Sequence, residues 1–254
     1  MDGSGGTDRA TTDREALIRR WVAALDEDAL RREYQETDGL LVMPSLLPPS
    51  LITEMIAEAR ALSPKVVRKH ALFVRRAGAI HHHVIVEHAP AMHALHQSAE
   101  LLALFERVTG IALEHRAPTE AHASALYAYR GGDFLDWHYD ECGCEPGDSF
   151  STIIGLVDQS TARLEIETRK DQPGQDVQRR SLATSPGTFA FFCGTRAYHR
   201  VTKLAPNEER ITFAFTYLRK GRRPKGMYNF RMQLGNTFVY FGLGHLFPRN
   251  KASG

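Results

Sequence analysis

The second half of the chain is a succession of short strand-like segments, and this pattern limits the fold more than any other feature of the sequence. Between residues 121 and 218, segments rich in β-branched and aromatic residues alternate with turn residues. The predicted strands cover residues 125–129, 150–157, 163–168, 178–183, 188–192, 199–203 and 210–218. Many short strands at this spacing are typical of an antiparallel double-sheet barrel of the jelly-roll type.

The first half of the chain has mainly helical periodicity. We predict helices over residues 13–25, after Asp26, over 51–62 and, as one long helix, over 90–109, with strands over 39–43 and 66–76. Because the helices precede most of the strands, we expect them to pack on one outer face of the barrel. The fold class is therefore mainly β with flanking α: a double-stranded β-helix, jelly-roll or cupin-like, with N-terminal helices packed on it.

Length and composition favour a single globular domain without a membrane span. The chain has 254 residues, 43% of them hydrophobic, and a formal net charge of +2. We expect a flexible tail over residues 1–12 and one domain over 13–254, with the barrel core at about 121–218. The small net charge argues against nucleic acid as a general partner. No segment reaches the roughly 18 apolar residues of a membrane span, and no apolar leader follows Met1.

Three cysteines bear on the compartment of the protein. Cys142, Cys144 and Cys193 do not form a disulfide framework, and the short spacing of the first two is awkward for a mutual bridge. A reducing, cytoplasmic location fits this usage best. Two interpretations stay open for Cys142 and Cys144, namely redox or soft-metal chemistry and plain packing in a loop.

One polar pattern within the predicted barrel points to metal chemistry. His138 and Asp140 are two residues apart on a predicted strand, so their side chains share one face. His199 on a later strand completes a set of two histidines and one carboxylate. Such a set holds non-haem Fe(II) and leaves coordination positions open for oxygen chemistry. Arg210 begins the last predicted strand and offers a planar fork that suits a carboxylate co-substrate.

The histidine triplet at residues 81–83 is the competing metal motif. It has no defined ligand geometry, because a strand would direct its middle residue to the opposite face. We therefore assign the metal and the catalysis to His138, Asp140 and His199.

Several motifs together resemble the Fe(II)/2-oxoglutarate-dependent oxygenases, and the prolyl-4-hydroxylase-like branch in particular. They are Tyr129-Arg-Gly-Gly-Asp-Phe with His138-Tyr-Asp140, then Ser185-Pro-Gly-Thr-Phe-Ala-Phe-Phe, Tyr198-His-Arg-Val-Thr and Glu209-Arg-Ile-Thr-Phe, within residues 127–217. The resemblance implies that Fe(II) binds His138, Asp140 and His199. It also implies that 2-oxoglutarate pairs with Arg210, with hydroxyl partners at Tyr129 and Thr212, and that O2 takes an open metal position.

A narrower resemblance is to the halogenases and hydroxylases of free, lysine-like amino acids. In the halogenases a glycine replaces the metal carboxylate, so Asp140 favours hydroxylation. This resemblance places substrate recognition at Arg75, Glu120, Glu141 and Thr216. Arg75 would hold a carboxylate, and the two glutamates would hold an ammonium group.

Arg76 remains an alternative to Arg75, because adjacent residues of a strand point to opposite faces and only one can point inward. Glu120 would also need a bulge or an early strand start to face the same way as Tyr129. Surface arginines and carboxylates without a binding role are the competing interpretation for all of these residues.

We thus expect a hydroxylase of a free, basic amino acid or a related small molecule, which releases succinate and CO2. A peptidyl or prolyl-type hydroxylase is the alternative, and a non-catalytic cupin-like binding module is a third class. Weak net charge and Thr216, where a second arginine would be needed, argue against nucleobase demethylation. Residues 229–247 could complete the barrel, cover the site or pack a homodimer.

Overall fold

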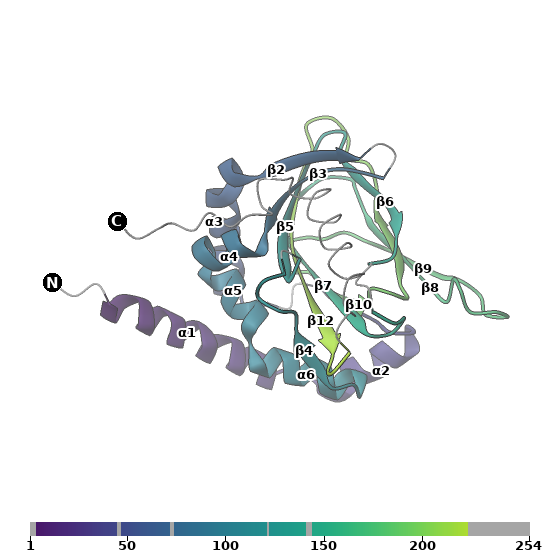
Figure 1. The fold of residues 1–254 in the computed structure, drawn as a ribbon, viewed down its shortest axis with the longest axis horizontal. Coiled ribbons are helices and arrows are strands. Elements are labelled where there is room, and N and C mark those ends of the chain that lie inside the picture. The colour runs from purple at the N-terminus through teal and green to yellow at the C-terminus, as the bar shows by residue number, and fades with distance from the viewer. Residues whose placement is uncertain (1–3, 45–46, 72–73, 121, 141–143, 223–254) are drawn as a thin grey trace.

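The computed structural model describes residues 4–44, 47–71, 74–120, 122–140 and 144–222. Figure 1 shows the described helices gathered on one side of a curled sheet. The helices are α1 (Ser4–Ala23), α2 (Glu27–Glu36), α3 (Pro49–Leu62), the short 3-10 helix η1 (Ser63–Lys65), α4 (His82–His88), α5 (Pro90–Gln97) and α6 (Ala99–Thr109). No helix among these residues is both long and apolar enough to cross a membrane.

The strands of the described residues form one twelve-stranded sheet, and every pairing between them is antiparallel. They are β1 (Leu40–Met43), β2 (Val67–Ala71), β3 (Arg75–His81), β4 (Leu113–His115), β5 (Ser124–Arg130), β6 (Phe134–His138), β7 (Ser149–Gln159), β8 (Leu164–Thr168), β9 (Gln178–Leu182), β10 (Phe189–Cys193), β11 (Tyr198–Val201) and β12 (Glu209–Arg219). The order is β1-β10-β7-β12-β5-β3-β6-β11-β8-β9, with β2 on β3 and β4 on β12. The predicted fold class, a jelly-roll barrel with helices packed on it, is confirmed.

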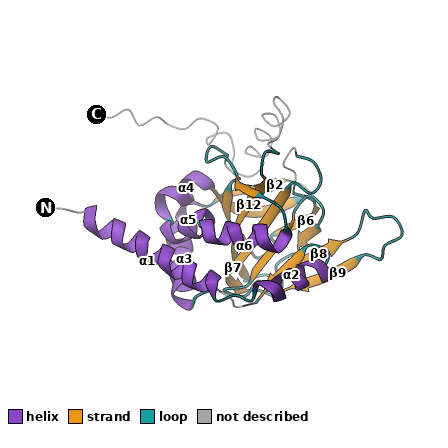
Figure 2. Cartoon of the chain, turned by 90° about the horizontal axis from the view of Figure 1, so that it is seen from below, coloured by secondary structure: helices purple, strands orange, loops and turns teal. Residues whose placement is uncertain are grey.

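Strand alternation divides the long strand β12 between two environments. Ile211, Phe213, Phe215 and Tyr217 are buried in the largest apolar cluster, which they share with the helices. Figure 2 shows the helices lying along this side of the sheet. The alternate residues, which include Arg210 and Thr212, therefore point to the other side, into the barrel. The helix layer thus fixes which side chains the sheet presents inward.

Two predicted elements differ from the structure. The long helix expected over residues 90–109 is two helices, because Ser98 caps α6 by accepting a hydrogen bond from the main-chain N–H of Leu101. The strand expected over residues 66–76 is the pair β2 and β3. Helix α1 begins at Ser4, within the segment that was expected to be a flexible tail up to Thr12.

The barrel also begins earlier in the chain than residue 121. Strand β3 lies between β5 and β6 in the sheet, and β1 pairs with β10. These pairings join residues far apart in sequence, so no local pattern predicts them. As a result, Arg75 at the start of β3 lies within the barrel wall.

Candidate active site

Three ligand-type side chains converge where β6 and β11 pair. His138 is the last residue of β6 and lies opposite His199 of β11, and Asp140 follows two residues later. Nε2 of His138 and Nε2 of His199 lie 3.7 and 3.6 Å from Oδ1 of Asp140. Ligand atoms of all three residues lie within 4.8 Å of one another. The structure thus brings together the three residues that the sequence predicted as metal ligands.

Hydrogen bonds to the main chain determine which nitrogen of each histidine faces this point. Nδ1 of His138 lies 2.8 Å from the carbonyl oxygen of Asp136, and Nδ1 of His199 lies 3.0 Å from that of Ala197. Because a carbonyl only accepts, we assign the proton of each ring to Nδ1, which donates. Each Nε2 then keeps its lone pair for a cation. Bonds of this kind orient the imidazoles that bind metals.

The two carboxylate oxygens of Asp140 have different partners. Oδ1 faces both histidines, whereas Oδ2 accepts a hydrogen bond from the hydroxyl of Ser151 on β7. The main-chain N–H of Asp140 donates to the carbonyl of Gly194 over 2.9 Å. A Cβ at Gly194 would lie 2.5 Å from Oδ2 of Asp140, so a larger residue would displace the carboxylate. Sequence reasoning missed Ser151 and Gly194, since neither carries a signal that links it to the metal motif.

The protonation states also favour a cation at this point. Burial tends to raise the pKa of Asp140, but His199 and His138 together hold it well below its usual range. Burial and the neighbouring His138 lower the pKa of His199 to about 4. Burial opposes a rise in the pKa of His138, yet the contact with Asp140 raises it. An ionised carboxylate thus faces the imidazoles. A divalent cation bound there would replace the proton that the contact with Asp140 favours on His138.

Arg210 supplies a buried cation in the barrel interior. Its side chain is 1% exposed, and its Nε and Nη1 atoms have no hydrogen-bond partner among the residues that the structure describes. Arg210 lies opposite Tyr129 of β5 in the register, with Cζ 5.8 Å from the centroid of the Tyr129 ring. Burial lowers the pKa of Arg210, because the charged form loses its hydration. A buried guanidinium with free donors is costly unless a carboxylate pairs with it.

Two hydroxyl groups predicted beside this cation are also buried. Tyr129 is 3% exposed, and burial raises its pKa, which keeps the phenol protonated as a donor. Thr212 is buried two residues after Arg210 and therefore shares its face of β12. Both side chains face the barrel interior on the same side of the sheet as Arg210. A carboxylate that pairs with Arg210 would lie in that interior.

The metal-ligand cluster and Arg210 face one common space. Val201 follows His199 by two residues on β11, so the two side chains share a face. Val201 is packed in a buried cluster with Tyr129, the register partner of Arg210. A ligand that spans from the histidines to Arg210 would therefore cross the barrel interior without passing through the sheet.

The structure resolves the alternative between Arg75 and Arg76. Arg75 is 1% exposed and close enough to Tyr129 that its charge lowers the pKa of the phenol, against the larger effect of burial. Arg76 has a side chain that is 49% exposed, and its Nε lies 3.3 Å from Oδ1 of Asp133. Arg75 therefore points inward, and Arg76 points out of the barrel.

The other predicted substrate residues lie in different surroundings, and not all of them are among the described residues. Glu120 is buried, but its Oε2 already accepts from Nη1 of Arg116 over 2.8 Å. Thr216 lies on the same face of β12 as Arg210 and pairs in register with Ser151, the partner of Asp140. Glu141 and residues 229–247 lie outside the described residues. Glu120 is thus held in an ion pair that sequence reasoning did not foresee.

The cysteines also depart from expectation. Cys144 is disulfide-bonded, which corrects the prediction that the thiols near the metal motif form no bridge. Cys193 is free and buried at the end of β10. Cys142 lies outside the described residues.

Comparisons with known proteins establish the fold. No protein-family model matches the chain, and no curated protein matches its sequence. The nogalamycin-biosynthesis epimerase SnoN, solved in complex with Fe3+, α-ketoglutarate and nogalamycin RO, is 15% identical with a TM-score of 0.62. That match covers 90% of this chain and 92% of SnoN. At this level of identity, the likeness shows a shared fold.

Two further solved structures share this architecture. The α-ketoglutarate-dependent carbocyclase SnoK is 16% identical with a TM-score of 0.63, over 84% of this chain and 92% of SnoK. A Pseudomonas putida prolyl-4-hydroxylase is 16% identical with a TM-score of 0.56, over 78% of this chain and 99% of the hydroxylase. The chain therefore has the fold of non-haem, α-ketoglutarate-dependent iron enzymes.

Proposed function

We propose that this chain is an Fe(II)- and 2-oxoglutarate-dependent dioxygenase that hydroxylates an unactivated C–H bond of a small molecule. The observation that carries the proposal is the shared interior of two sites. One is a set of two histidines and a carboxylate with Nε2 and Oδ1 atoms turned together. The other is the buried guanidinium of Arg210, whose Nε and Nη1 have no partner among the described residues. The first fits Fe(II), and the second fits the distal carboxylate of 2-oxoglutarate.

Each residue of the site has a task in this proposal. His138, Asp140 and His199 would hold Fe(II) through one atom each, which leaves positions for the 2-oxo acid and O2. Arg210 would fix the far end of 2-oxoglutarate, and Tyr129 and Thr212 would donate to it. Fe(II) with O2 and 2-oxoglutarate supplies the oxidising chemistry, with succinate and CO2 as by-products. The protein orients the target carbon and excludes water.

An anaerobic titration tests this assignment without a known substrate. A metal site that chelates the 2-oxo acid gives a visible charge-transfer band when Fe(II) and 2-oxoglutarate are both added. We expect the band in the wild-type protein and its loss in Asp140→Ala. Arg210→Lys should keep the band but need more 2-oxoglutarate. A wild-type protein that binds Fe(II) without developing the band would contradict the proposal.

We further propose a free basic amino acid as the substrate. Support comes from Arg75, which is buried in the barrel near Tyr129 and could pair with a substrate carboxylate. Glu120 supports an ammonium site only in part, because it already contacts Arg116. A substrate ammonium would then join an existing ion pair rather than neutralise a lone carboxylate. Thr216 lines the same strand face, toward the metal end.

Neighbouring arginines provide a matched control for this substrate class. Lysine, ornithine and arginine should stimulate succinate formation, and norleucine should not. Arg75→Ala should strongly weaken the binding of basic amino acids, measured as their stimulation of succinate formation. Arg76→Ala changes a residue of the outer face and should leave that binding unchanged. Stimulation by a prolyl peptide instead would favour the peptidyl hydroxylase alternative. A cytoplasmic location stays a prediction, and the disulfide at Cys144 is the observation against it.

A further inference from the structure

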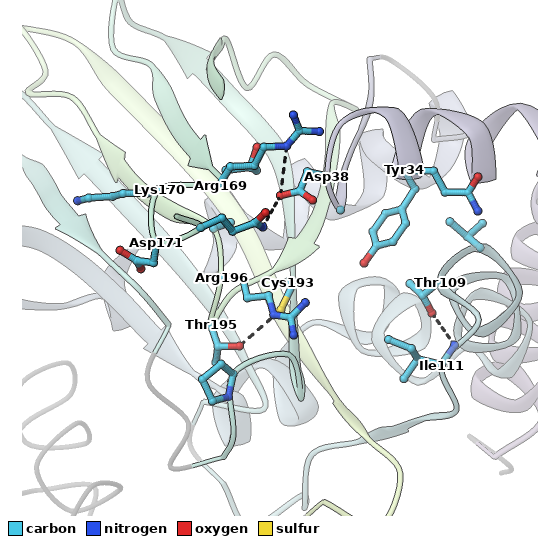
Figure 3. Close-up of a pocket in the computed structure, with 17 residues that line it drawn as sticks. Tyr34, Asp38, Thr109, Ile111, Arg169, Lys170, Asp171, Cys193, Thr195 and Arg196 are labelled. Atoms are coloured by element: carbon cyan, nitrogen blue, oxygen red, sulfur yellow. Dashed lines mark hydrogen bonds and ion pairs between the residues drawn. The ribbon is translucent and has the colours of Figure 1, made fainter. Parts of the chain in front are cut away.

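A cavity lies between α2, the end of α6 and the turn that joins β10 to β11. Its volume is about 810 Å³. Figure 3 shows Tyr34 of α2 and Arg196 of the turn extending toward this space from opposite sides. Val108 and Ile111 line it as apolar residues. Pockets that bind small organic molecules are typically about 300–1,000 Å³, so the volume suits such a ligand.

The cavity borders the helix-facing side of β10 and also reaches residues beside the proposed iron site. Cys193, which lines the cavity, belongs to the apolar cluster shared with the helices, as does Phe191. Phe192 points to the opposite face of β10, where its ring centroid lies 5.0 Å from that of His199. Ala197, which also lines the cavity, packs in a cluster with Phe192, and its carbonyl oxygen accepts from Nδ1 of His199. One end of the cavity therefore lies next to the metal-ligand cluster.

Both carboxylates that line the cavity already have partners. Asp38 accepts a hydrogen bond from Gln172 over 3.1 Å and lies 3.8 Å from Nε of Arg169. Asp171 accepts a hydrogen bond from the hydroxyl of Tyr139. Neither carboxylate therefore offers a vacant site for a cationic ligand.

The three cations that line the cavity differ in the partners of their charged groups. Arg169 faces Asp38, and Nζ of Lys170 lies 3.1 Å from the ring centroid of Tyr198. The Arg196 side chain forms no ion pair with any residue that the structure describes. Lys170 and Arg196 are thus the lining cations without a carboxylate partner among the described residues. Lys170 is held against the Tyr198 ring, whereas the exposed guanidinium of Arg196 lies beside an apolar wall.

We propose that this cavity binds a small amphipathic organic anion. Its carboxylate or sulfonate would pair with Arg196, and its apolar body would pack against the Tyr34 ring and Ile111. A guanidinium favours planar oxyanions because it can donate two parallel hydrogen bonds. The proposal does not depend on the iron or 2-oxoglutarate assignment, since Arg196, Tyr34 and Ile111 belong to neither of those sites.

The test uses a pair of fluorescent probes that differ in charge, with the metal-free full-length protein. The anionic probe is 8-anilinonaphthalene-1-sulfonate, and its uncharged counterpart is N-phenyl-1-naphthylamine. We expect saturable binding of the anionic probe and about tenfold weaker binding by Arg196→Gln, since a charge-assisted hydrogen bond is lost. Arg196→Lys should stay within about threefold of wild type. Binding of the uncharged probe should not depend on Arg196.

Three controls locate the probe. Arg180→Gln changes an exposed arginine of β9 that does not line the cavity, and it should bind as wild type does. Ile111→Trp should fill the cavity and abolish binding, while circular dichroism confirms the fold. Excess 2-oxoglutarate should not displace the probe. Equal affinity of wild type and Arg196→Gln, displacement by 2-oxoglutarate, or no binding to wild type would each overturn the proposal.

Discussion

Histidines gather in two places of this molecule, and the two groups differ in what their ring nitrogens face. In the barrel, His138 and His199 turn Nδ1 to main-chain carbonyls and Nε2 to Asp140. On the outer side of the sheet, a second group lies among α4, α5 and β4. We call it the outer histidine group, and its members are His82, His93, His96 and His115.

The outer histidine group is packed like an apolar core. The ring centroid of His96 lies 5.5 Å from that of His82, 5.4 Å from that of His115 and 5.2 Å from that of Phe215. His96 is fully buried, and its Nε2 has no hydrogen-bond partner within the described part of the chain. Burial lowers the pKa of all four histidines, that of His82 to about 4. These rings are therefore neutral near pH 7.

The difference shows that a high density of histidines does not by itself make a metal site. Among the residues that the structure describes, only the barrel group places three ligand atoms within 4.8 Å of one another. The triplet at 81–83 is divided, because His81 ends β3, His82 begins α4 and His83 is exposed. The barrel group combines a carboxylate with two imidazoles whose Nε2 atoms turn toward it, and the outer group shows no such convergence among the described residues.

The largest expected effect separates the two groups directly. His138→Ala, Asp140→Ala and His199→Ala should each abolish Fe(II) binding and succinate formation, because each removes one of three ligands. His83→Ala, an exposed residue beside the outer group, should leave both unchanged. Metal binding is measured by calorimetry and succinate by coupled assay. Near-normal, iron-dependent turnover in any two of the three variants would contradict the assignment of His138, Asp140 and His199 as metal ligands.

Arg210 extends the barrel group and should show the next largest effect. Arg210→Ala should raise the Michaelis constant for 2-oxoglutarate steeply, because truncating one partner of a buried charge pair costs about 2–5 kcal/mol. Fe(II) affinity should change little, since Arg210 is not among the metal-ligand cluster. Steady-state kinetics and calorimetry separate the two quantities. An unchanged Michaelis constant would show that another residue holds the co-substrate.

The outer histidine group should control stability rather than metal binding. The folded pKa of His82 is about 4 against an ordinary value of 6.5, so the folded state binds fewer protons than the unfolded state. Its stabilising contribution is therefore complete above pH 6.5 and is lost as the pH falls toward 4. One pKa unit corresponds to about 1.4 kcal/mol, so the loss from His82 is on the order of 3 kcal/mol.

The variant His82→Gln tests this contribution. It removes the titrating ring and keeps a polar group near the hydroxyl of Ser124, which lies 2.8 Å from Nδ1 of His82. The groups that face His82 are His83, His93 and His96, and none of them is a carboxylate. Urea unfolding at pH 7.5 and 4.5 should show a smaller drop in the free energy of unfolding than wild type shows. Equal drops in the two proteins would contradict the prediction.

The sequence predicts local alternation well and long-range pairing poorly. His138 and Asp140 lie two residues apart on one strand, so their common face follows from geometry alone. His199 and Arg210 each begin a predicted strand, so the face of each side chain also follows from alternation along its own strand. The place of β3 between β5 and β6 depends instead on pairings between distant segments, and so does the inward position of Arg75. Two arginines in sequence offer no local feature that distinguishes the inner from the outer.

Three side-chain contacts were also missed by sequence reasoning. Arg116 neutralises Glu120 because the turn between them brings the two side chains together. Ser98 divides the long predicted helix by capping, although the apolar periodicity continues on both sides. Ser151 reaches Asp140 from β7, eleven residues along the chain. The first two are short-range contacts that apolar periodicity does not reveal, and only the contact of Ser151 depends on a neighbouring strand.

The smallest expected effect concerns Ser151, and it sharpens the contrast between an oriented and an unoriented ligand group. Its hydroxyl holds Oδ2 of Asp140, so that Oδ1 alone faces the two histidines. We expect Ser151→Ala to bind Mn(II) or Co(II) about 10–100-fold more weakly, since removing an outer-shell partner costs this much in other metal sites. Ser151→Thr keeps the hydroxyl and should restore most of the affinity. The Co(II) absorption spectrum should change in Ser151→Ala, because a freed carboxylate can bind through both oxygens.

A wild-type protein that binds no metal would contradict the metal site itself. Equal affinity and identical spectra in wild type and Ser151→Ala would show instead that the metal site stands and that Asp140 is oriented by the carbonyl of Gly194 alone.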